Sequence, residues 1–260
     1  NKLMDRPLSV IILGQNTILA KEILKIINLR FKKKIKIIAT CSDLKLKKFI
    51  AGLFKYRIVF LSNKIRNEKK ILELIRNNKV DLIFSLQHKW IISEEIIKLA
   101  NNSIFNFHFG KIPEYRGHDP VIYSILDKQK FFFSTIHKIS KTVDTGEIVS
   151  EKKIKNLDEI PRVIERKMVK TFKLQFITMI NKIFKKEKIK TKKIKIANLK
   201  KFKKINSLRE KKLISNLNDL EKKTTAFNQA PHEPAFFLYN KKKYYVLKNY
   251  KEYLKYKNKK

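Results

Sequence analysis

The residues most able to do chemistry lie in one short stretch, "IFNFHFGKIPEYRGHDP", from Ile104 to Pro120. Asn106 and His108 are two positions apart in it. Because side chains alternate between two faces of a strand, this amide and this imidazole share one face. An amide donor beside an imidazole suits a reaction that polarises a carbonyl and moves a proton. Two satisfied polar residues at the edge of a core have the same pattern, so the pair alone leaves both interpretations open.

Glycines are concentrated in the same part of the chain. Of five glycines, three (Gly110, Gly117 and Gly146) fall between residues 110 and 146, and glycine is favoured where a loop needs positive φ or a close backbone approach. Asp144 precedes Gly146 in "KTVDTGEI". A carboxylate near His108 would orient the imidazole and raise its basicity. We therefore expect a site built from loops, with Asp144 as its third catalytic residue, although tight turns without catalysis need the same glycines.

The first half of the chain supplies elements that can position these residues. Short apolar runs predict buried strands at 8–14, 35–41, 56–62, 80–86 and 103–109. Segments with helical spacing lie between most of them, at 18–29, 68–76 and 94–99. This alternation predicts an α/β fold, with a Rossmann-like, mostly parallel sheet and helices on both faces. Asn106 and His108 then lie at the C-terminal end of a parallel strand, where such sheets bind ligands.

The second half of the chain does not continue this alternation of strands and helices. It predicts a helix near 120–126, strands at 131–139 and 147–155, and a long helix over 158–184. We expect a catalytic domain at 1–184, a basic linker or extended segment at 185–207, and a small C-terminal subdomain at 208–260. That subdomain is expected to contain a helix over 208–220 and a β-hairpin around Asn240.

The formal net charge of +39 has two interpretations. One is a polyanionic partner such as nucleic acid. The other is biased composition, which we favour because only 9 of the 62 basic residues are arginine, the residue that reads nucleic acid bidentately. A positive field would still recruit a phosphorylated substrate.

Cysteine and histidine usage limits the chemistry further. Cys41 is the only cysteine, so no intrachain disulfide forms, which fits a reducing cytoplasm. No stretch approaches the ~18 apolar residues of a membrane span. The chain has five histidines, which are His88, His108, His118, His137 and His232. Their spacing is not that of zinc ligands, so we expect no metal.

Two stretches together resemble a known family. "N-F-H-x₄-P-x-Y-R-G-x-x-P", followed by "T-I-H-K-I-x-K-x-V-D-T-G-E-I", is similar to the formyltransferases that use 10-formyltetrahydrofolate. The resemblance runs from about residue 8 to 184, and the C-terminal "TTAFNQAPHEPAFFLYNKKKYYVLK" is similar to the short tail of some members. It implies that Asn106, His108 and Asp144 are the catalytic trio. It also implies a pterin site along the loop 85–93, where the donor-binding residues would be Leu86, Gln87, His88, Trp90, Ile91 and Ile92.

Family members differ in the amine that they formylate. Enzymes acting on methionyl-tRNA carry a larger C-terminal barrel, and those acting on glycinamide ribonucleotide have a glycine-rich loop where this chain has "LGQNT". The resemblance therefore favours the group that formylates nucleotide-linked amino-deoxysugars for surface polysaccharides, often as dimers joined through a C-terminal hairpin. Within it, the acceptor pocket is expected to include Gln15, Asn16, Tyr115 and Arg116, although Arg116 could equally brace its loop. A shortened methionyl-tRNA formyltransferase and an inactive basic RNA-binding protein remain the alternatives.

Overall fold

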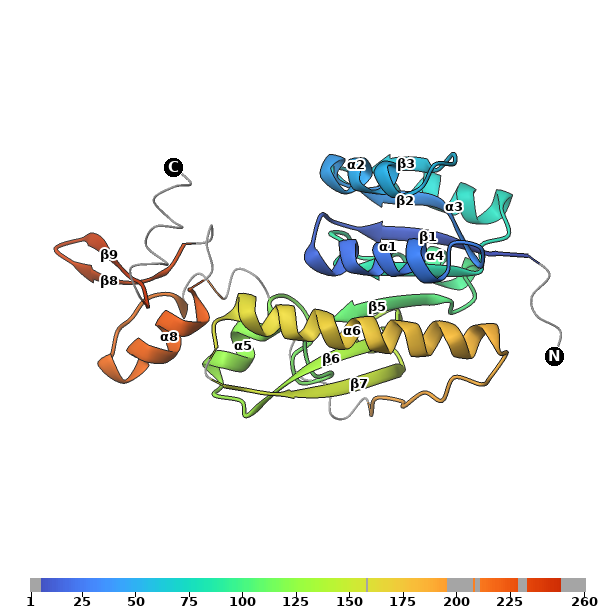
Figure 1. Cartoon of the computed structure of the whole chain (residues 1–260). Helices are drawn as coiled ribbons and strands as arrows, with labels where there is room; N and C mark the ends of the chain where they lie inside the picture. The colour runs from blue at the N-terminus through green and yellow to red at the C-terminus, as the bar shows by residue number, and fades with distance from the viewer. Residues whose placement is uncertain (1–5, 158, 196–207, 209–210, 229–232, 249–260) are drawn as a thin grey trace. The chain divides into compact units, whose positions relative to one another are not determined.

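The computed structural model describes residues 6–157, 159–195, 208, 211–228 and 233–248. The chain forms two compact units (Figure 1). The first consists of Asn1–His108, Ser134–Lys152 and Val169–Leu199, and the second of Phe109–Phe133, Lys153–Met168 and Lys200–Lys260. Much of the predicted basic segment 185–207 lies outside the described residues.

A mixed sheet forms the centre of the fold. Its strands are β1 (Leu8–Gly14), β2 (Ile35–Ser42), β3 (Val59–Ser62), β4 (Leu82–Leu86), β5 (Ile104–His108), β6 (Phe131–Lys138) and β7 (Ile148–Lys155). They are ordered β3-β2-β1-β4-β5-β6-β7. The pairings from β3 to β5 are parallel, and β6 runs antiparallel to β5. The predicted α/β class with a mostly parallel sheet is confirmed. The strand order reverses between β1 and β4, which is where sheets of this kind bind ligands.

Helices connect these strands. They are α1 (Ile18–Arg30), α2 (Leu44–Leu53), α3 (Glu68–Asn77), α4 (Glu94–Leu99), α5 (Pro120–Leu126), α6 (Pro161–Phe184) and α8 (Leu220–Ala226). Thr17 and Asp43 cap α1 and α2, since their side chains accept hydrogen bonds from the backbone N–H groups of Ala20 and Leu46. All the predicted helices of the first 184 residues are present, whereas α2 was not predicted.

The two faces of the sheet have different cores. On one face Phe84 and Phe107 meet Phe176 of α6, which also contacts Phe31 just after α1; α1 and α6 lie on the same side of the sheet in Figure 1. On the other face Ile83 and Ile104 belong to a cluster that includes buried residues of α3 and α4. Burial of each large apolar side chain contributes about 1.5–3 kcal/mol. Strand β5 is therefore fixed from both sides before its polar residues are considered.

The second unit contains a hairpin and a short helix. Strands β8 (Ala235–Tyr239) and β9 (Lys242–Val246) pair antiparallel around Asn240 and Lys241. Both turn residues have positive φ (47° and 61°), as a two-residue type I′ turn requires. The hairpin prediction is confirmed.

The helix predicted over 208–220 is present only in part. Leu208 and Lys211 are helical, the helix ends before Leu213, and a 3₁₀ turn, η2 (Leu217–Asp219), leads into α8 at Leu220. Upstream, Leu213 forms a parallel bridge with Phe236. The N–H of Ile214 donates to the carbonyl of Phe236 at 2.7 Å. Backbone pairing with β8 therefore overrides the helical spacing of this segment.

Candidate active site

Strand β5 presents two predicted catalytic residues on one face. Ile104, Asn106 and His108 alternate with Phe105 and Phe107, and Phe107 packs against Phe172 and Phe176 of α6. The phenylalanines thus hold the strand on the α6 side. His108 is 6% exposed. The amide and the imidazole therefore lie at the edge of the core, where little solvent reaches them.

The antiparallel partner strand adds a residue that the sequence did not single out. The register pairs Asn106 with His137 and His108 with Thr135. His137 is 1% exposed, and its Nε2 lies 3.1 Å from Asn106 Nδ2. A histidine therefore stands directly beside the candidate amide, on the same face of the sheet.

Asp144 comes from the connection between β6 and β7. Its φ of 51° lies in the left-handed region, which aspartate tolerates better than most residues. The turn is held by Thr145 Oγ1, which donates to the carbonyl of Thr142 at 2.8 Å and lies 2.9 Å from Ser140 Oγ. A Cβ added at Gly146 would lie 1.8 Å from the carbonyl oxygen of Lys138. Only glycine fits there, so the expectation of a glycine-shaped loop is confirmed at Gly146.

The four side chains form one cluster, in which the two histidines are buried and Asn106 and Asp144 are half-buried. His108 Nδ1 lies 3.5 Å from Asp144 Oδ2, and His137 Nε2 lies 3.3 Å from Asp144 Oδ1. Asn106 Nδ2 also donates to Asp144 Oδ1, at 3.3 Å. The structure therefore brings together the three predicted residues Asn106, His108 and Asp144, and adds His137.

The hydrogen bonds indicate how protons are arranged in this cluster. His137 Nδ1 lies 2.8 Å from the carbonyl oxygen of Lys138, which can only accept, so Nδ1 carries a proton. With the proton on Nδ1, Nε2 can accept from Asn106 Nδ2. At His108 the nitrogen that faces Asp144 is Nδ1, so Nε2 points to the other side of the ring. A carboxylate that orients one imidazole nitrogen makes the other a better proton acceptor.

The loop predicted to hold the donor follows β4. Leu86 and Ile92 are buried in the core, whereas Ile91 is 65% exposed. Trp90 Nε1 donates to the carbonyl of Asn63 at 2.9 Å. His88 Nδ1 is buried without a hydrogen-bond partner among the described residues. Burial lowers the pKa of His88 from 6.5 to about 4, so this ring is neutral at pH 7.

Two of the predicted acceptor residues lie at the end of β1. Gln15 Nε2 donates to the carbonyl of Gln87 at 2.7 Å, at the point where the strand order reverses. The N–H of Asn16 donates to Asp43 Oδ2 at 2.6 Å. Asn16 Oδ1 is buried and has no partner among the residues that the structure describes. These two residues thus adjoin the predicted donor loop.

The other two predicted acceptor residues, Tyr115 and Arg116, belong to the second unit. Tyr115 donates its hydroxyl proton to Asp127 Oδ2 at 3.0 Å. Burial and the nearby Asp127 carboxylate raise the pKa of Tyr115, so its hydroxyl stays protonated. The side chain of Arg116 is also buried, with 8% of the residue exposed. Both side chains thus contribute to the packing of the second unit.

In the described part of the chain, no group of three or more His, Cys, Asp or Glu side chains is arranged to hold a metal ion. None of the helices in these ranges is both long enough and apolar enough to cross a membrane.

Comparison with known proteins identifies the family. Residues 14–173 match the Formyl transferase family, and the chain therefore belongs to it as a formyltransferase-family enzyme. A stretch of 101 residues is 33% identical to the bifunctional polymyxin resistance protein ArnA of Wigglesworthia glossinidia brevipalpis. That stretch covers 39% of this chain and 15% of the relative's length.

Solved structures share the fold over most of the chain. A 4-N formyltransferase from Francisella tularensis superposes with a TM-score of 0.71 at 19% identity, covering 92% of this chain and 96% of the other. The N-formyltransferase from Helicobacter canadensis, solved with folinic acid and dTDP-3-aminofucose, gives 0.66 at 18% identity, covering 91% and 86%. At such identities the likeness concerns the fold alone.

Proposed function

We propose that this enzyme transfers a formyl group from 10-formyltetrahydrofolate to the primary amine of a nucleotide-linked amino-deoxysugar. The observation that carries the proposal is the hydrogen-bonded cluster of Asn106, His108 and Asp144 at the C-terminal end of β5, in a chain of the formyl transferase family. An amide donor, an imidazole and an orienting carboxylate are the groups that such a transfer needs.

The catalytic roles follow from the atoms that face one another. Asn106 Nδ2 donates to the oxygen that becomes negative as the amine attacks the formyl carbon. One of its N–H bonds is kept by His137 Nε2, so the bond released for this task is the longer one, to Asp144 at 3.3 Å. His108 Nε2 accepts the amine proton while Asp144 holds Nδ1. The proton finally passes to the nitrogen that loses the formyl group, which balances the reaction.

The donor-binding loop has groups that fit a reduced folate. Bound 10-formyltetrahydrofolate would supply the formyl carbon. The loop 86–92 offers an exposed apolar side chain at Ile91 and an unpartnered buried nitrogen at His88. Gln87 adopts positive φ (57°) directly after the buried Leu86. We propose that this loop holds the pterin through its backbone and through Trp90 and Ile92.

An amino-sugar nucleotide is the acceptor that we favour. Gln15, Asn16, Tyr115 and Arg116 are its proposed binding residues. The unpartnered Oδ1 of Asn16 can accept a hydrogen bond from a sugar hydroxyl or base. The surplus of basic residues would attract the diphosphate. The Helicobacter canadensis relative, which was solved with a dTDP-linked amino sugar, supports this choice by its fold.

We further propose that two copies associate through the C-terminal hairpin. Phe237, Tyr239 and Tyr244 are 42%, 62% and 43% exposed, and the rings of Phe237 and Tyr244 stack at 5.4 Å. A two-stranded hairpin is only marginally stable alone, so a second copy that covers these rings would stabilise it.

The reaction would take place in the cytoplasm, as a step in the synthesis of a surface-polysaccharide (O-antigen) sugar.

The test is an acceptor panel. The full chain is incubated with 10-formyltetrahydrofolate and dTDP-, UDP- or GDP-linked amino sugars, and in parallel with charged initiator methionyl-tRNA. We expect turnover with at least one nucleotide sugar and none with tRNA. Turnover of methionyl-tRNA alone would favour the tRNA enzyme. No turnover, together with RNA binding that weakens steeply with salt, would favour the inactive RNA binder.

A further inference from the structure

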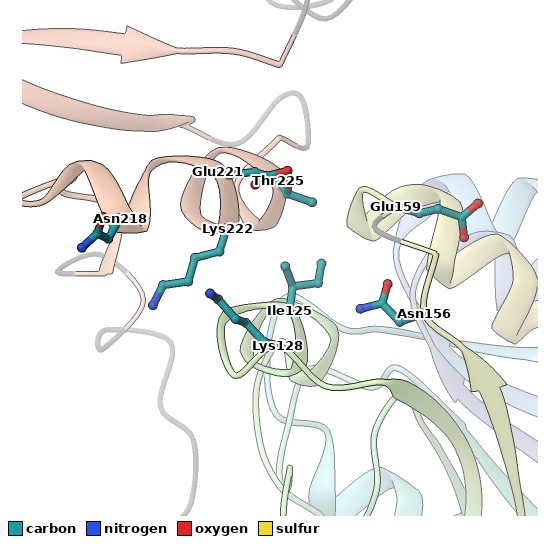
Figure 2. Close-up of a pocket in the computed structure, with 8 residues that line it drawn as sticks. All are labelled: Ile125, Lys128, Asn156, Glu159, Asn218, Glu221, Lys222 and Thr225. Carbon is teal, nitrogen blue, oxygen red and sulfur yellow. The ribbon is translucent and has the colours of Figure 1, made fainter.

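A second hollow lies wholly within the second unit. It has a volume of about 300 Å³ and lies between the end of α5, the connection from β7 to α6, and the segment formed by η2 and α8 (Figure 2). Its lining residues within the described ranges are Ile125, Lys128, Asn156, Glu159, Asn218, Glu221, Lys222 and Thr225. A hollow of this size fits a small molecule at the lower end of the range for ligand pockets. None of the proposed catalytic or folate-binding residues lines it.

The lining is polar and carries both signs of charge. It contains two lysines and two glutamates, although the whole chain has 62 basic and 23 acidic residues. The lysine-rich composition therefore does not account for it. Among the lining residues that the structure describes there is no aromatic ring on which a pterin or nucleobase could stack, and Ile125 is the one aliphatic side chain. The chemistry fits a small hydrophilic ligand that bears both charges.

The charged side chains of the lining differ in whether another side chain is already paired with them. Lys222 Nζ is paired with Asp219 at 2.6 Å, and Glu159 with Lys167 at 2.6 Å. In contrast, the side chains of Lys128 and Glu221 make no hydrogen bond or ion pair within the described ranges. In Figure 2 the ammonium ends of Lys128 and Lys222 both lie on the side of Ile125 away from Asn156, with Lys222 reaching down from α8 and Lys128 reaching up. An anion there would meet the ammonium group of Lys128 and, beside the Asp219 carboxylate, that of Lys222, and Glu221 remains for a cation.

We propose that this hollow binds a small amine-bearing phosphate ester, distinct from both substrates of the formyl transfer. Lys128 and Lys222 contact the phosphate and Glu221 contacts the primary ammonium. The hydroxyl of Thr225, next to Glu221 in Figure 2, can bond a hydroxyl group of the ligand. The ligand is too small to be a nucleotide-linked sugar, so this site is not a second copy of the proposed acceptor site.

The test uses the full chain and three probes in isothermal titration calorimetry: glucosamine 6-phosphate, glucose 6-phosphate and glucosamine. We expect glucosamine 6-phosphate to bind at least about tenfold more tightly than either comparator, since each lacks one charged contact. Lys128→Gln and Glu221→Gln should each weaken it by about tenfold. Glu221→Gln should also remove the preference over glucose 6-phosphate.

Matched controls separate the site from the general positive field. Lys36→Gln and Glu73→Gln make the same charge changes at exposed positions of the first unit, and should change the affinity less than about twofold. Equal binding of glucose 6-phosphate, absence of binding by glucosamine 6-phosphate, or equal effects of control and site variants would each overturn the proposal. None of these results depends on the acceptor of the formyl transfer.

Discussion

Two polar clusters at strand ends of the first unit are built differently. After β1 and β2, side chains bond to backbone: Asp43 accepts from the N–H groups of Leu46 and Asn16 through its two oxygens. Asn63 Nδ2 likewise donates to the carbonyl of Gly14 at 3.2 Å. At the ends of β5 and β6, in contrast, the side chains of the proposed site bond mainly to one another.

The difference distinguishes side chains that hold the backbone in place from side chains that take part in the proposed reaction. Side chain–side chain bonds make up only about 10–15% of protein hydrogen bonds, and a buried network of them is destabilising unless its members satisfy one another. Asp43 fixes a loop and uses both of its oxygens to do so, as a structural carboxylate does. Asp144 instead faces two imidazoles and an amide, so its charge acts on groups that can transfer protons. Substitutions at the two clusters should therefore have different signatures.

After the loss of His108 itself, the largest effect is expected at Gly146. Gly146→Ala forces the added Cβ against the Lys138 carbonyl, so the loop that carries Asp144 must move. We expect kcat to fall about 100-fold, the usual result of a displacement near 1 Å, and the free energy of unfolding to fall by about 3 kcal/mol. Formyl-transfer kinetics and urea unfolding measure the two quantities.

Gly52→Ala in α2 is the matched control. An added Cβ at Gly52 meets nothing within 4 Å, so the same change should stabilise the helix by up to about 1 kcal/mol and leave kcat unchanged. Equal behaviour of the two variants would show that the loop at Gly146 has no special constraint.

The next effect concerns pH and His88. Its pKa is 6.5 when exposed and about 4 in the folded chain, so folding disfavours the protonated ring. The associated stability is fully present above pH 6.5 and is lost as the pH falls towards 4, by up to about 3 kcal/mol. The pH dependence of urea unfolding should be shallower in His88→Gln over this range. Parallel curves for the two proteins would contradict the burial of this ring.

A smaller effect is expected at His137, which we regard as a positioning residue. His137→Phe keeps a buried ring but leaves an Asn106 N–H without its acceptor, so kcat should fall about 30-fold, or about 2 kcal/mol, with KM little changed. His137→Gln offers an amide oxygen near the same place and should recover part of the loss. A change confined to thermal stability in both variants would assign His137 to packing alone.

The smallest effect is expected in the other cluster. Asp43→Ala removes the cap of α2 and the bond to Asn16, and should lower the free energy of unfolding by about 1–2 kcal/mol. Asp43→Asn can still cap the helix through its oxygen, so it should lose roughly half as much. A loss of kcat as large as that at His137 would erase the distinction between the two clusters.

Local pattern in the sequence was sufficient for most of the fold. The apolar runs predicted β1 to β5, and alternation placed Asn106 and His108 together. Helix α2 was missed because its lysines interrupt the apolar spacing and Gly52 weakens the helical signal. The helix expected at 208–220 is interrupted by pairing of Leu213 with Phe236, more than twenty residues later.

Within the site, the position of His137 likewise could not be predicted from local sequence pattern. It lies 31 residues from Asn106, and only the antiparallel register of β5 and β6 places the two side chains opposite each other. A shift of one residue would turn His137 to the other face of the sheet. Sequence can thus predict which face of one strand carries polar groups, whereas the partner across the strand depends on tertiary pairing.

The most direct test of the proposed mechanism is single-turnover formyl transfer by His108→Ala with saturating donor and the acceptor identified by the panel. We predict a rate at least about 1,000-fold below that of the unmodified chain, with an unchanged far-ultraviolet circular dichroism spectrum. A rate within threefold of the unmodified chain, at equal folding, would contradict the assignment of His108 as the proton acceptor.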